Sequence, residues 1–506
     1  MKRPFRGLRG QAPAASYDAV VIGAGIGGLV CANLLARAGL RVLLVEQHYM
    51  VGGYCSTFRR KGYTFDAATH FYPLLGNPAT VTGRLLSDLD IDSGGWIRMD
   101  PVDQFHFPDG SRFSVPADFD RYVAALRSDF PDEQDAIDRF FTLARQAYLC
   151  GLLYYFRGQD SDRLDPFRDL TLRDAIDRQF RSPKLKLLLA ADCGHWGSPP
   201  SRISFLFDAM LRLSYFLGNY YPRGGSQAFA DALAQRLEAR GGHILMQSLV
   251  TRILVERGRA SGIELETGPP HRRASVRISA GAVVSNADLM LTLERLLRHE
   301  PAAQTPLDAA RRLRPTLPCF LVHMGVAGIP RDVLAEAHGY HWASWDAEDV
   351  ATRAFKIFVP TLYEPAMAPP GGHVVIVQKL TDVDGRRVDD WAAHKEEVER
   401  HIMGRLDQIV PGFSRAIVTK LSASAMTSYR YTLNYRGAML GWEMSPDQLG
   451  PARPAVDGPF EGLHFVGHWT QPGGGVTPVI VSAMRVAERI AGTTVHPHAP
   501  AASAHP

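Results

Sequence analysis

Three glycines in the order Gly23-x-Gly25-x-x-Gly28 have the spacing that points most directly to chemistry. Such a turn lets backbone N–H groups and the positive end of a helix dipole approach a phosphate. The first glycine permits the tight turn, the second lets a pyrophosphate reach the backbone, and the third allows close helix–strand packing. Glu46 follows Gly25 by 21 residues, where a carboxylate can accept hydrogen bonds from ribose hydroxyls. Together with Gly27 these residues predict a dinucleotide site; a glycine turn without a ligand is the alternative.

Two further groups of glycines extend this pattern. Gly52-Gly53 follows the acidic residue, and a second glycine pair at this place is typical of flavin-binding folds rather than of NAD dehydrogenases. Near the C-terminus, Gly473-Gly474-Gly475 precedes a predicted helix. Three glycines let the backbone pass close to a flat ring, and the helix dipole would stabilise a reduced flavin anion. The glycines therefore predict a flavin site, with a helix-capping turn as the alternative.

Four segments resemble the superfamily of phytoene desaturases, carotenoid isomerases and retinol saturases. They are VEQHYMVGGYCSTFRRKGYTFDAATHFYPLLG (45–76), YPRGGSQAFADALAQRLEARGGHILMQSLVTRILVE (221–256), VVSNAD (283–288) and LHFVGHWTQPGGGVTPVIVSAMRVAERI (463–490). The resemblance implies that the backbone of Val250 contacts adenine and that Gly467 begins a turn against the flavin. It implies FAD as the cofactor, held by Gly23, Gly25, Gly27, Gly28, Glu46, Gly52, Gly53, Val250, Gly467, Gly473, Gly474, Gly475 and Val476.

In this superfamily the flavin carries out the redox step while the protein orients a long polyene and excludes water. By resemblance, the segment with His70 and Tyr72 runs toward the flavin and the substrate, where either side chain can donate a proton or place a chain end. Trp469 is expected to form part of the tunnel wall. These three are the predicted catalytic residues, and structural roles are the alternative. The aromatic segments Tyr148–Phe156 and Ser214–Tyr221 are expected to form an apolar substrate wall or plain core.

Alternating strand and helix patterns predict the elements that position these groups. A strand at Asp18–Gly23, a helix at Ile26–Ala38 and a strand at Arg41–Glu46 form the βαβ pattern of a parallel sheet. Other strands are expected at 243–247, 250–256, 261–266, 275–284, 316–326, 354–360, 373–379 and 463–467, with helices at 226–240 and 475–491.

The expected fold class is α/β, with a two-dinucleotide-binding (Rossmann-like) FAD domain and a discontinuous mixed sheet-and-helix substrate domain. The expected order is a flexible basic arm (1–16), FAD-binding segments at 17–112, 223–300 and 436–492, substrate-domain segments at 113–222 and 301–435, and a flexible tail (493–506).

The net charge of the chain is concentrated at one end. The 506 residues include 56 Lys plus Arg and 52 Asp plus Glu, a formal charge of +4. Lys2, Arg3, Arg6 and Arg9 account for this excess, because residues 1–16 contain no acid. A neutral body argues against a nucleic-acid partner. The arm is expected either to attract an anionic membrane surface or to have no role.

The five cysteines (31, 55, 150, 193 and 319) form no paired motif. This pattern predicts no disulfide framework and no metal site, and it favours a reducing compartment. Cys55 is expected to be a packing residue. The uncharged stretch Ala19–Ala36 imitates a membrane span, but the nucleotide turn explains its glycines. The expected location is the cytoplasm, with peripheral contact on the inner face of a membrane.

The function expected from these features is an FAD-dependent oxidoreductase or isomerase that acts on double bonds of a carotenoid, a retinoid or a related polyene lipid. Its partner would be an apolar polyene or isoprenoid small molecule, and the oligomeric state is not indicated. Two alternatives stay open. One is a flavin amine oxidase on the same fold, for which a lysine near the flavin would be expected. The other is a non-catalytic prenyl-binding module like the GTPase dissociation inhibitors.

Overall fold

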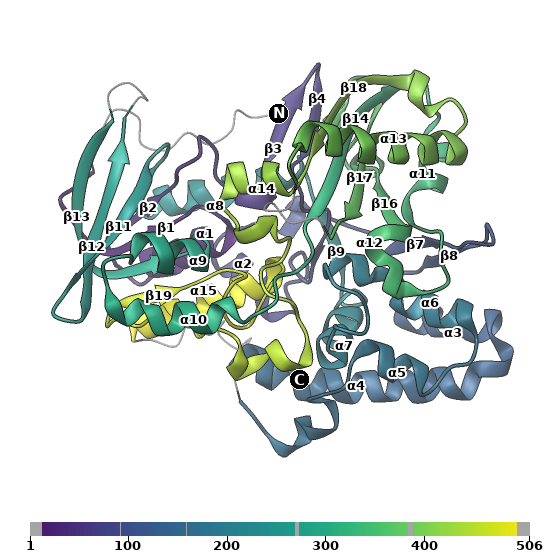
Figure 1. The fold of residues 1–506 in the computed structure, drawn as a ribbon, viewed down its shortest axis with the longest axis horizontal. Coiled ribbons are helices and arrows are strands. Elements are labelled where there is room, and N and C mark those ends of the chain that lie inside the picture. The colour runs from purple at the N-terminus through teal and green to yellow at the C-terminus, as the bar shows by residue number, and fades with distance from the viewer. Residues whose placement is uncertain (1–12, 92, 158, 269–272, 383–387, 493–506) are drawn as a thin grey trace, which may run out of the picture.

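The computed structural model describes residues 13–91, 93–157, 159–268, 273–382 and 388–492. The predicted basic residues 2–9 and the C-terminal tail lie outside these residues. Two large sheets, two small ones and a layer of helices make up the described part (Figure 1). In the described ranges, no helix combines the length and apolar character needed to cross a membrane.

The first sheet joins strands from three distant parts of the chain and lies at the left of Figure 1. Its order is β10 (His243–Leu245), β2 (Val42–Val45), β1 (Ser16–Ile22), β13 (Ala274–Ser285), β12 (Arg259–Thr267) and β11 (Leu249–Glu256), with β19 (Leu463–Phe465) beside β13. β1 runs parallel to both neighbours, and Ala19 lies opposite Val42 and Ala282. The central strands of this sheet are therefore parallel, as the βαβ pattern predicts.

Helices cover both faces of the first sheet, which explains why β1 is apolar on both sides. Ala19 and Val21 pack with α1 (Ile26–Arg37), α8 (Ser226–Ala239) and α15 (Val476–Ala491). Val20 and Ile22 pack on the opposite face with α9 (Leu289–Leu291) and α10 (Gln304–Arg311).

The second sheet is mostly antiparallel and lies at the upper right of Figure 1. Its order is β18 (Ile417–Ala423), β14 (Cys319–Ala327), β17 (Gly372–Leu380), β16 (Ala354–Phe358), β15 (Gly339–Trp342), β7 (Asp103–His106) and β8 (Arg112–Val115). α11 (Arg331–Ala337) and α13 (Trp391–Ile409) pack on one face through Leu334, Ile402 and Leu406. The other face packs through Leu321, Val374 and Ile376 against Tyr63 and Phe65.

The helical layer fills the lower right of Figure 1 and packs around one apolar core. Its helices are α3 (Phe119–Asp129), α4 (Gln134–Arg157), α5 (Leu172–Asp177), α6 (Pro183–Ala190) and α7 (Phe205–Ser214). Shorter elements link the layers: β3 (Thr57–Arg60) with β4 (Tyr63–Asp66), β5 (Tyr72–Pro73) with β9 (Asn219–Pro222) and β6 (Trp96–Arg98), and the helices α2 (Val81–Asp88), α12 (Val350–Arg353) and α14 (Ala425–Thr432).

Predicted boundaries near residues 16, 112 and 300 differ from the division between the sheets, the last because α10 packs on the first sheet. The boundary at residue 112 falls at the start of β8, and both β7 and β8 pair within the second sheet. The first FAD-binding segment therefore ends earlier than predicted, because these short strands follow the first sheet in sequence but pair with β15. The arm predicted to end at residue 16 is also shorter, since Ser16 begins β1 and the Ala15 carbonyl accepts a hydrogen bond from Ser279 N–H.

Candidate functional site

A cavity of about 1390 Å³ lies where the two sheets and the helical layer meet. The turn after β1, the end of β2 and the start of α15 line one part of it. The second sheet and the helices α4 and α7 line another part. The cavity thus brings the glycine motifs and the predicted substrate domain to a single site.

The turn between β1 and α1 is shaped by glycines that leave no room for side chains. A Cβ on Gly28 would lie 2.1 Å from the Gly23 carbonyl oxygen, so this glycine permits close packing of helix on strand. A Cβ on Gly27 would lie 2.7 Å from Oδ1 of Asn286. Gly23, Gly25 and Gly27 line the cavity, whereas Gly28 is not part of its wall. α1 has no side-chain cap, so its first amides are available to an anion.

Glu46 follows β2 and lines the same part of the cavity. Its Oε2 accepts a hydrogen bond from Ala24 N–H (2.7 Å), and its Oε1 accepts one from His48 N–H (2.8 Å). Burial raises the pKa of Glu46, and these backbone donors oppose the rise. Each carboxylate oxygen retains a lone pair that a ribose hydroxyl can use. Val250, on β11, lines the cavity as well.

The second glycine pair holds the chain against the first turn. Gly52 has φ +111°, and a Cβ there would lie 2.7 Å from the carbonyl oxygen of Cys55. Its N–H donates to the Ala24 carbonyl oxygen at 2.8 Å. A Cβ on Gly53 would lie 3.4 Å from Cα of Gly25. Both glycines line the cavity, and they keep this strip of backbone within reach of a ligand.

The C-terminal turn brings a second helix N-terminus to the cavity. Gly467, Gly474, Gly475 and Val476 all line it, and α15 begins at Val476 without a side-chain cap. Gly473 does not line the cavity. A Cβ there would lie 2.7 Å from the side chain of Met444, which packs behind the turn. Gly473 therefore shapes the turn, while the residues after it form the wall.

These features fit FAD. Two uncapped helix N-termini suit its pyrophosphate and its flavin edge, and the Glu46 carboxylate suits a ribose. Gly25, Gly27 and Gly53 line the cavity without side chains, so a ligand can lie close to the backbone there.

His70 lines the cavity and is 3% exposed. Neither of its ring nitrogens has a hydrogen-bond partner among the described residues. Its ring stacks on Phe358 with centroids 4.8 Å apart. Burial is the main reason that the pKa of His70 is well below its usual value, and the charge of Lys356 lowers it further. The ring is therefore neutral near pH 7 and suits hydrogen bonding rather than proton donation from an imidazolium.

Tyr72 is fully buried but is not part of the cavity wall. It packs in the core against Trp96 and Phe229, because β5 pairs with β9 at this point and fixes the side chain there. This position gives Tyr72 a packing role, contrary to the expectation that it meets substrate. Trp469 does line the cavity, although most of its ring is in the core, where it packs edge to face on Trp442 at 4.7 Å.

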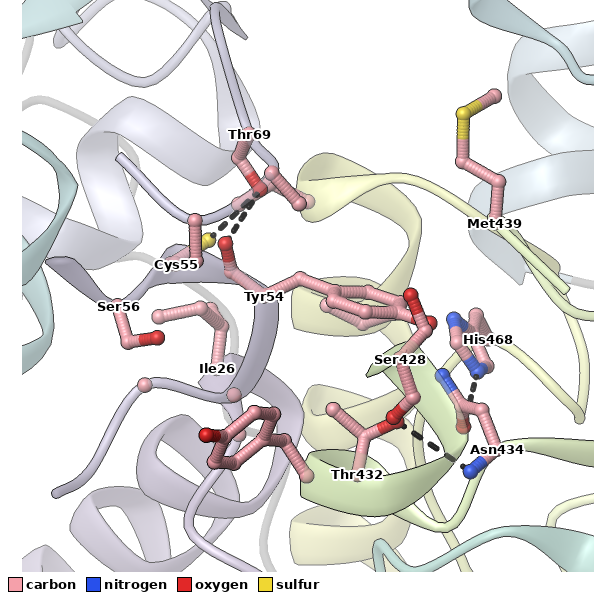
Figure 2. Close-up of a pocket in the computed structure, with 18 of the residues that line it drawn as sticks. Ile26, Tyr54, Cys55, Ser56, Thr69, Ser428, Thr432, Asn434, Met439 and His468 are labelled. Carbon is pink, nitrogen blue, oxygen red and sulfur yellow. Dashed lines mark hydrogen bonds between the residues drawn. The ribbon is translucent and has the colours of Figure 1, made fainter. Parts of the chain in front are cut away.

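A polar group lies opposite the glycine turns. Figure 2 shows the ring of Tyr54 near Ser428, Asn434 and His468. The Oδ1 of Asn434 is within 3.3 Å of both His468 Nε2 and Trp469 Nε1. Burial lowers the pKa of His468 to about 3, so its ring is neutral. Tyr54 and His468 lie in segments that resemble the superfamily, whereas Ser428 and Asn434 come from a segment with no recognised motif, and only folding brings them together.

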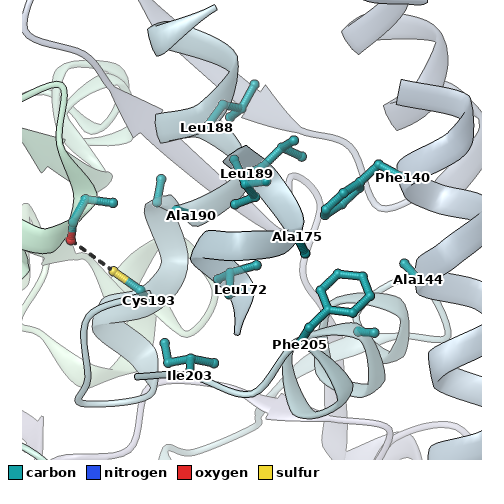
Figure 3. Close-up of a cluster of buried hydrophobic side chains, with 14 of the residues drawn as sticks. Phe140, Ala144, Leu172, Ala175, Leu188, Leu189, Ala190, Cys193, Ile203 and Phe205 are labelled. Carbon is teal, nitrogen blue, oxygen red and sulfur yellow. Dashed lines mark hydrogen bonds between the residues drawn. The ribbon is translucent and has the colours of Figure 1, made fainter. Parts of the chain in front are cut away.

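The apolar part of the cavity wall comes from the helical layer. α4 contributes Tyr148 and Leu152, and α7 contributes Phe207, Met210 and Leu211. Figure 3 shows the core that holds these helices, with Phe140 and Ala144 of α4 facing Phe205 of α7. The predicted wall segments 148–156 and 214–221 are thus partly at the cavity, through Tyr148, Leu152 and Ser214, and partly core.

All five cysteines are free thiols in the structure. Cys55 is buried, and burial raises its pKa to about 11, which fits a packing role. No group of three or more potential metal ligands occurs within the described ranges.

The sequence is similar to several curated proteins along most of its length. It is 28% identical to a chloroplastic prolycopene isomerase from an Oncidium hybrid cultivar, over 94% of this chain and 84% of the relative. It is 26% identical to a neurosporene-forming phytoene desaturase from Cereibacter sphaeroides, over 93% of this chain and 94% of the relative. It is 26% identical to human all-trans-retinol 13,14-reductase, over 89% of this chain and 82% of the relative. These relatives confirm the resemblance to the carotenoid and retinoid superfamily.

Solved structures share the fold. An oxidoreductase from Methanosarcina mazei superposes with a TM-score of 0.64 at 20% identity, over 93% of this chain and 99% of that one. Cyclohexylamine oxidase from Brevibacterium oxydans gives a TM-score of 0.62 at 18% identity, over 94% of this chain and 99% of that one. Both confirm the predicted α/β fold class. Residues 26–491 match the family described as flavin containing amine oxidoreductase. The protein therefore belongs to this family and is an FAD-dependent oxidoreductase.

Proposed function

We propose that the enzyme acts on double bonds of a carotenoid, a retinoid or a related polyene lipid, by desaturation, saturation or cis–trans isomerisation. The observation that carries this proposal is the apolar extension of the cavity between α4, α7 and the second sheet, which adjoins the residues that fit FAD. Relatives named as a prolycopene isomerase, a phytoene desaturase and a retinol reductase support it.

The cavity wall also bears on the amine oxidase alternative. The carboxylates that line it within the described residues are Glu46, Asp231 and Asp288. All three lie on elements that belong to the first sheet or pack on it. The extension between α4, α7 and the second sheet therefore has no carboxylate, among the described residues, that could pair with a substrate ammonium. An apolar chain is the better match.

The chain's own residues would hold the polyene rather than react with it. FAD, when bound, supplies the hydride or electron transfer at the double bond. The N-terminus of α15 would stabilise negative charge on the ring. Leu152, Phe207 and Met210 would exclude water and align the chain. His70 and Trp469 would contact the substrate, His70 as a neutral hydrogen-bonding group.

A cytoplasmic location with peripheral contact on a membrane completes the proposal. Leu149 and Leu153 of α4 are 65% and 54% exposed. Their neighbours Tyr148 and Leu152 line the cavity, so apolar surface continues from the cavity wall to the outside of the helix. Such a surface suits an enzyme that takes an apolar substrate from a bilayer.

The function can be tested with the holoenzyme under anaerobic conditions. A hydrocarbon carotenoid in its cis and trans forms and a retinoid are incubated with oxidised or reduced enzyme, and the products are separated by chromatography. We expect at least one polyene to change in double-bond number or geometry. If every polyene is returned unchanged while an amine such as putrescine reduces the bound flavin, the amine oxidase alternative replaces this proposal.

His70→Ala is expected to lower turnover about 10- to 100-fold while the flavin content stays at the wild-type level, because misplacing a substrate costs rate in this range. Tyr72→Phe provides the contrast, because its hydroxyl is buried in the core outside the cavity wall. We expect this variant to keep the wild-type rate. Single-turnover rates and flavin absorbance are measured for both variants. An unchanged rate in His70→Ala would show that His70 has a structural role and does not contact the substrate.

A further inference from the structure

A buried lysine sits at the centre of the face that the second sheet turns toward the cavity. Lys356 on β16 is 2% exposed and pairs across the strands with Gln378 on β17 and Tyr340 on β15. Residues directly opposite each other share a face of the sheet. Gln378 lines the cavity, so Lys356 lies on the cavity side, immediately behind the wall.

The hydrogen bonds of Lys356 connect it to the wall. Its Nζ lies 2.5 Å from Oδ2 of Asp103 and 2.9 Å from Nε2 of His195. An ammonium only donates, so Nε2 of His195 accepts and the ring proton is on Nδ1, 3.4 Å from the Tyr215 hydroxyl. Burial and the lysine charge keep the pKa of His195 well below its usual value. His195 lines the cavity as a neutral imidazole backed by a cation.

His70 lies over the same strand. Phe358, which stacks under its ring, is two residues beyond Lys356 and therefore on the same face of β16. Between the two histidines, Phe71 packs on His195 with centroids 4.3 Å apart. Both nitrogens of His70 are buried without a partner. Buried polar groups in native proteins are normally paired, so two unpartnered nitrogens at a cavity wall point to a ligand that supplies the partner.

We infer that His70 and Gln378, beside the paired cluster of His195, Lys356 and Asp103, bind an oxygen-bearing end of the polyene substrate, such as a hydroxyl, carbonyl or carboxylate group. This inference rests on the proposed function and narrows its substrate class. A ring N–H of His70 and the amide N–H of Gln378 can donate hydrogen bonds to such an oxygen, while His195 is held in the wall by Lys356 and Tyr215. A hydrocarbon end would leave His70 unpaired.

The test compares two polyenes of equal length and unsaturation, one ending in a primary hydroxyl and the other in a methyl group. Their binding to the oxidised holoenzyme is followed by the perturbation of the flavin absorbance. We expect the wild type to bind the hydroxyl form at least 10-fold more tightly. His70→Leu and Gln378→Leu should bring this ratio close to one, and His70→Gln, which keeps a hydrogen-bonding group, should restore part of it.

Lys379→Met is the matched control. Lys379 follows Gln378 on β17 and so points to the opposite face, where its Nζ donates to the Ala351 carbonyl oxygen at 2.6 Å. Its preference ratio should equal that of the wild type. Flavin content shows whether each variant is folded, and if His70→Leu fails to fold, Gln378→Leu alone decides the test.

The outcomes separate this inference from the proposed function. Equal affinity of the wild type for the two polyenes, with turnover of either, overturns the oxygen site and leaves the function standing. A preference for the hydroxyl form that survives both His70→Leu and Gln378→Leu also overturns the site. If neither polyene binds or reacts, the proposed function and the inference fall together.

Discussion

Gly25→Val is expected to yield a protein without bound flavin. Gly25 has φ −67° and ψ 172°, values that any residue adopts, so the substitution does not strain the backbone. Its space is limited instead: a Cβ would lie 3.0 Å from Nδ2 of Asn286, and the valine methyl groups would fill the cavity where α1 begins. The pyrophosphate needs this space to reach the backbone amides. Flavin binding, and all activity with it, should therefore be lost.

The ratio of flavin to protein absorbance in the purified variant measures this loss. Gly404→Val is the matched control, because Gly404 lies in α13 with nothing within 4 Å of its Cβ position. That variant should keep wild-type flavin content. The Gly25 variant should also melt at a lower temperature than the holoenzyme, close to the melting point of flavin-free wild type, since it lacks only the stabilisation by the ligand. Stoichiometric flavin in Gly25→Val would disprove the placement of the pyrophosphate.

The cofactor part of the site was predictable because local sequence determines it. Gly23 is needed for the turn, Gly25 for access of the pyrophosphate and Gly28 for helix–strand packing, and Glu46 follows within the same βαβ unit, so all four lie within one short segment. The folding of the nearby chain is enough to position them. The three distant segments of the first sheet were predictable for a similar reason, since each carries its own apolar strand pattern.

The substrate part of the site was not predictable in the same way. Asp103, His195 and Lys356 come from β7, the helical layer and β16, and no sequence spacing relates them. Only the pairing of β16 through β15 to β7 places the lysine near the aspartate. The neighbours His70 and Tyr72 looked equivalent in the sequence, but the pairing of β5 with β9 sends Tyr72 into the core.

Arg212→Met should destabilise the protein by about 3–5 kcal/mol, the usual cost of removing one partner of a buried ion pair. Arg212 on α7 is 5% exposed, and its Nε and Nη2 each lie 2.9 Å from an oxygen of the fully buried Asp208. Nη2 also donates to the Leu189 carbonyl oxygen, which ties α7 to α6. Without the guanidinium, the Asp208 carboxylate is left in the core with no countercharge within hydrogen-bond distance.

The pH dependence of this loss identifies its cause. Burial already raises the pKa of Asp208, and removing Arg212 takes away the charge that lowers it. The native variant then holds a proton that the unfolded chain has released above a pH of about 4, so its stability falls as pH rises. The deficit relative to wild type should therefore be larger at pH 8 than at pH 5. Denaturant unfolding followed by circular dichroism at both pH values measures this difference.

Two comparison variants show whether the uncompensated charge, rather than lost packing, is responsible. Arg173→Met removes an arginine of 38% exposure that pairs with Asp177 and Asp346, each at 2.7 Å, and should cost less than about 1 kcal/mol because solvent screens the pair. Arg212→Met combined with Asp208→Leu should recover part of the stability that the single change loses, since it removes the carboxylate bonded to the guanidinium and leaves only Asp192, 3.9 Å from Arg212, without a countercharge. A double variant as unstable as the single one, with a deficit equal at both pH values, would show that Arg212 acts through packing alone.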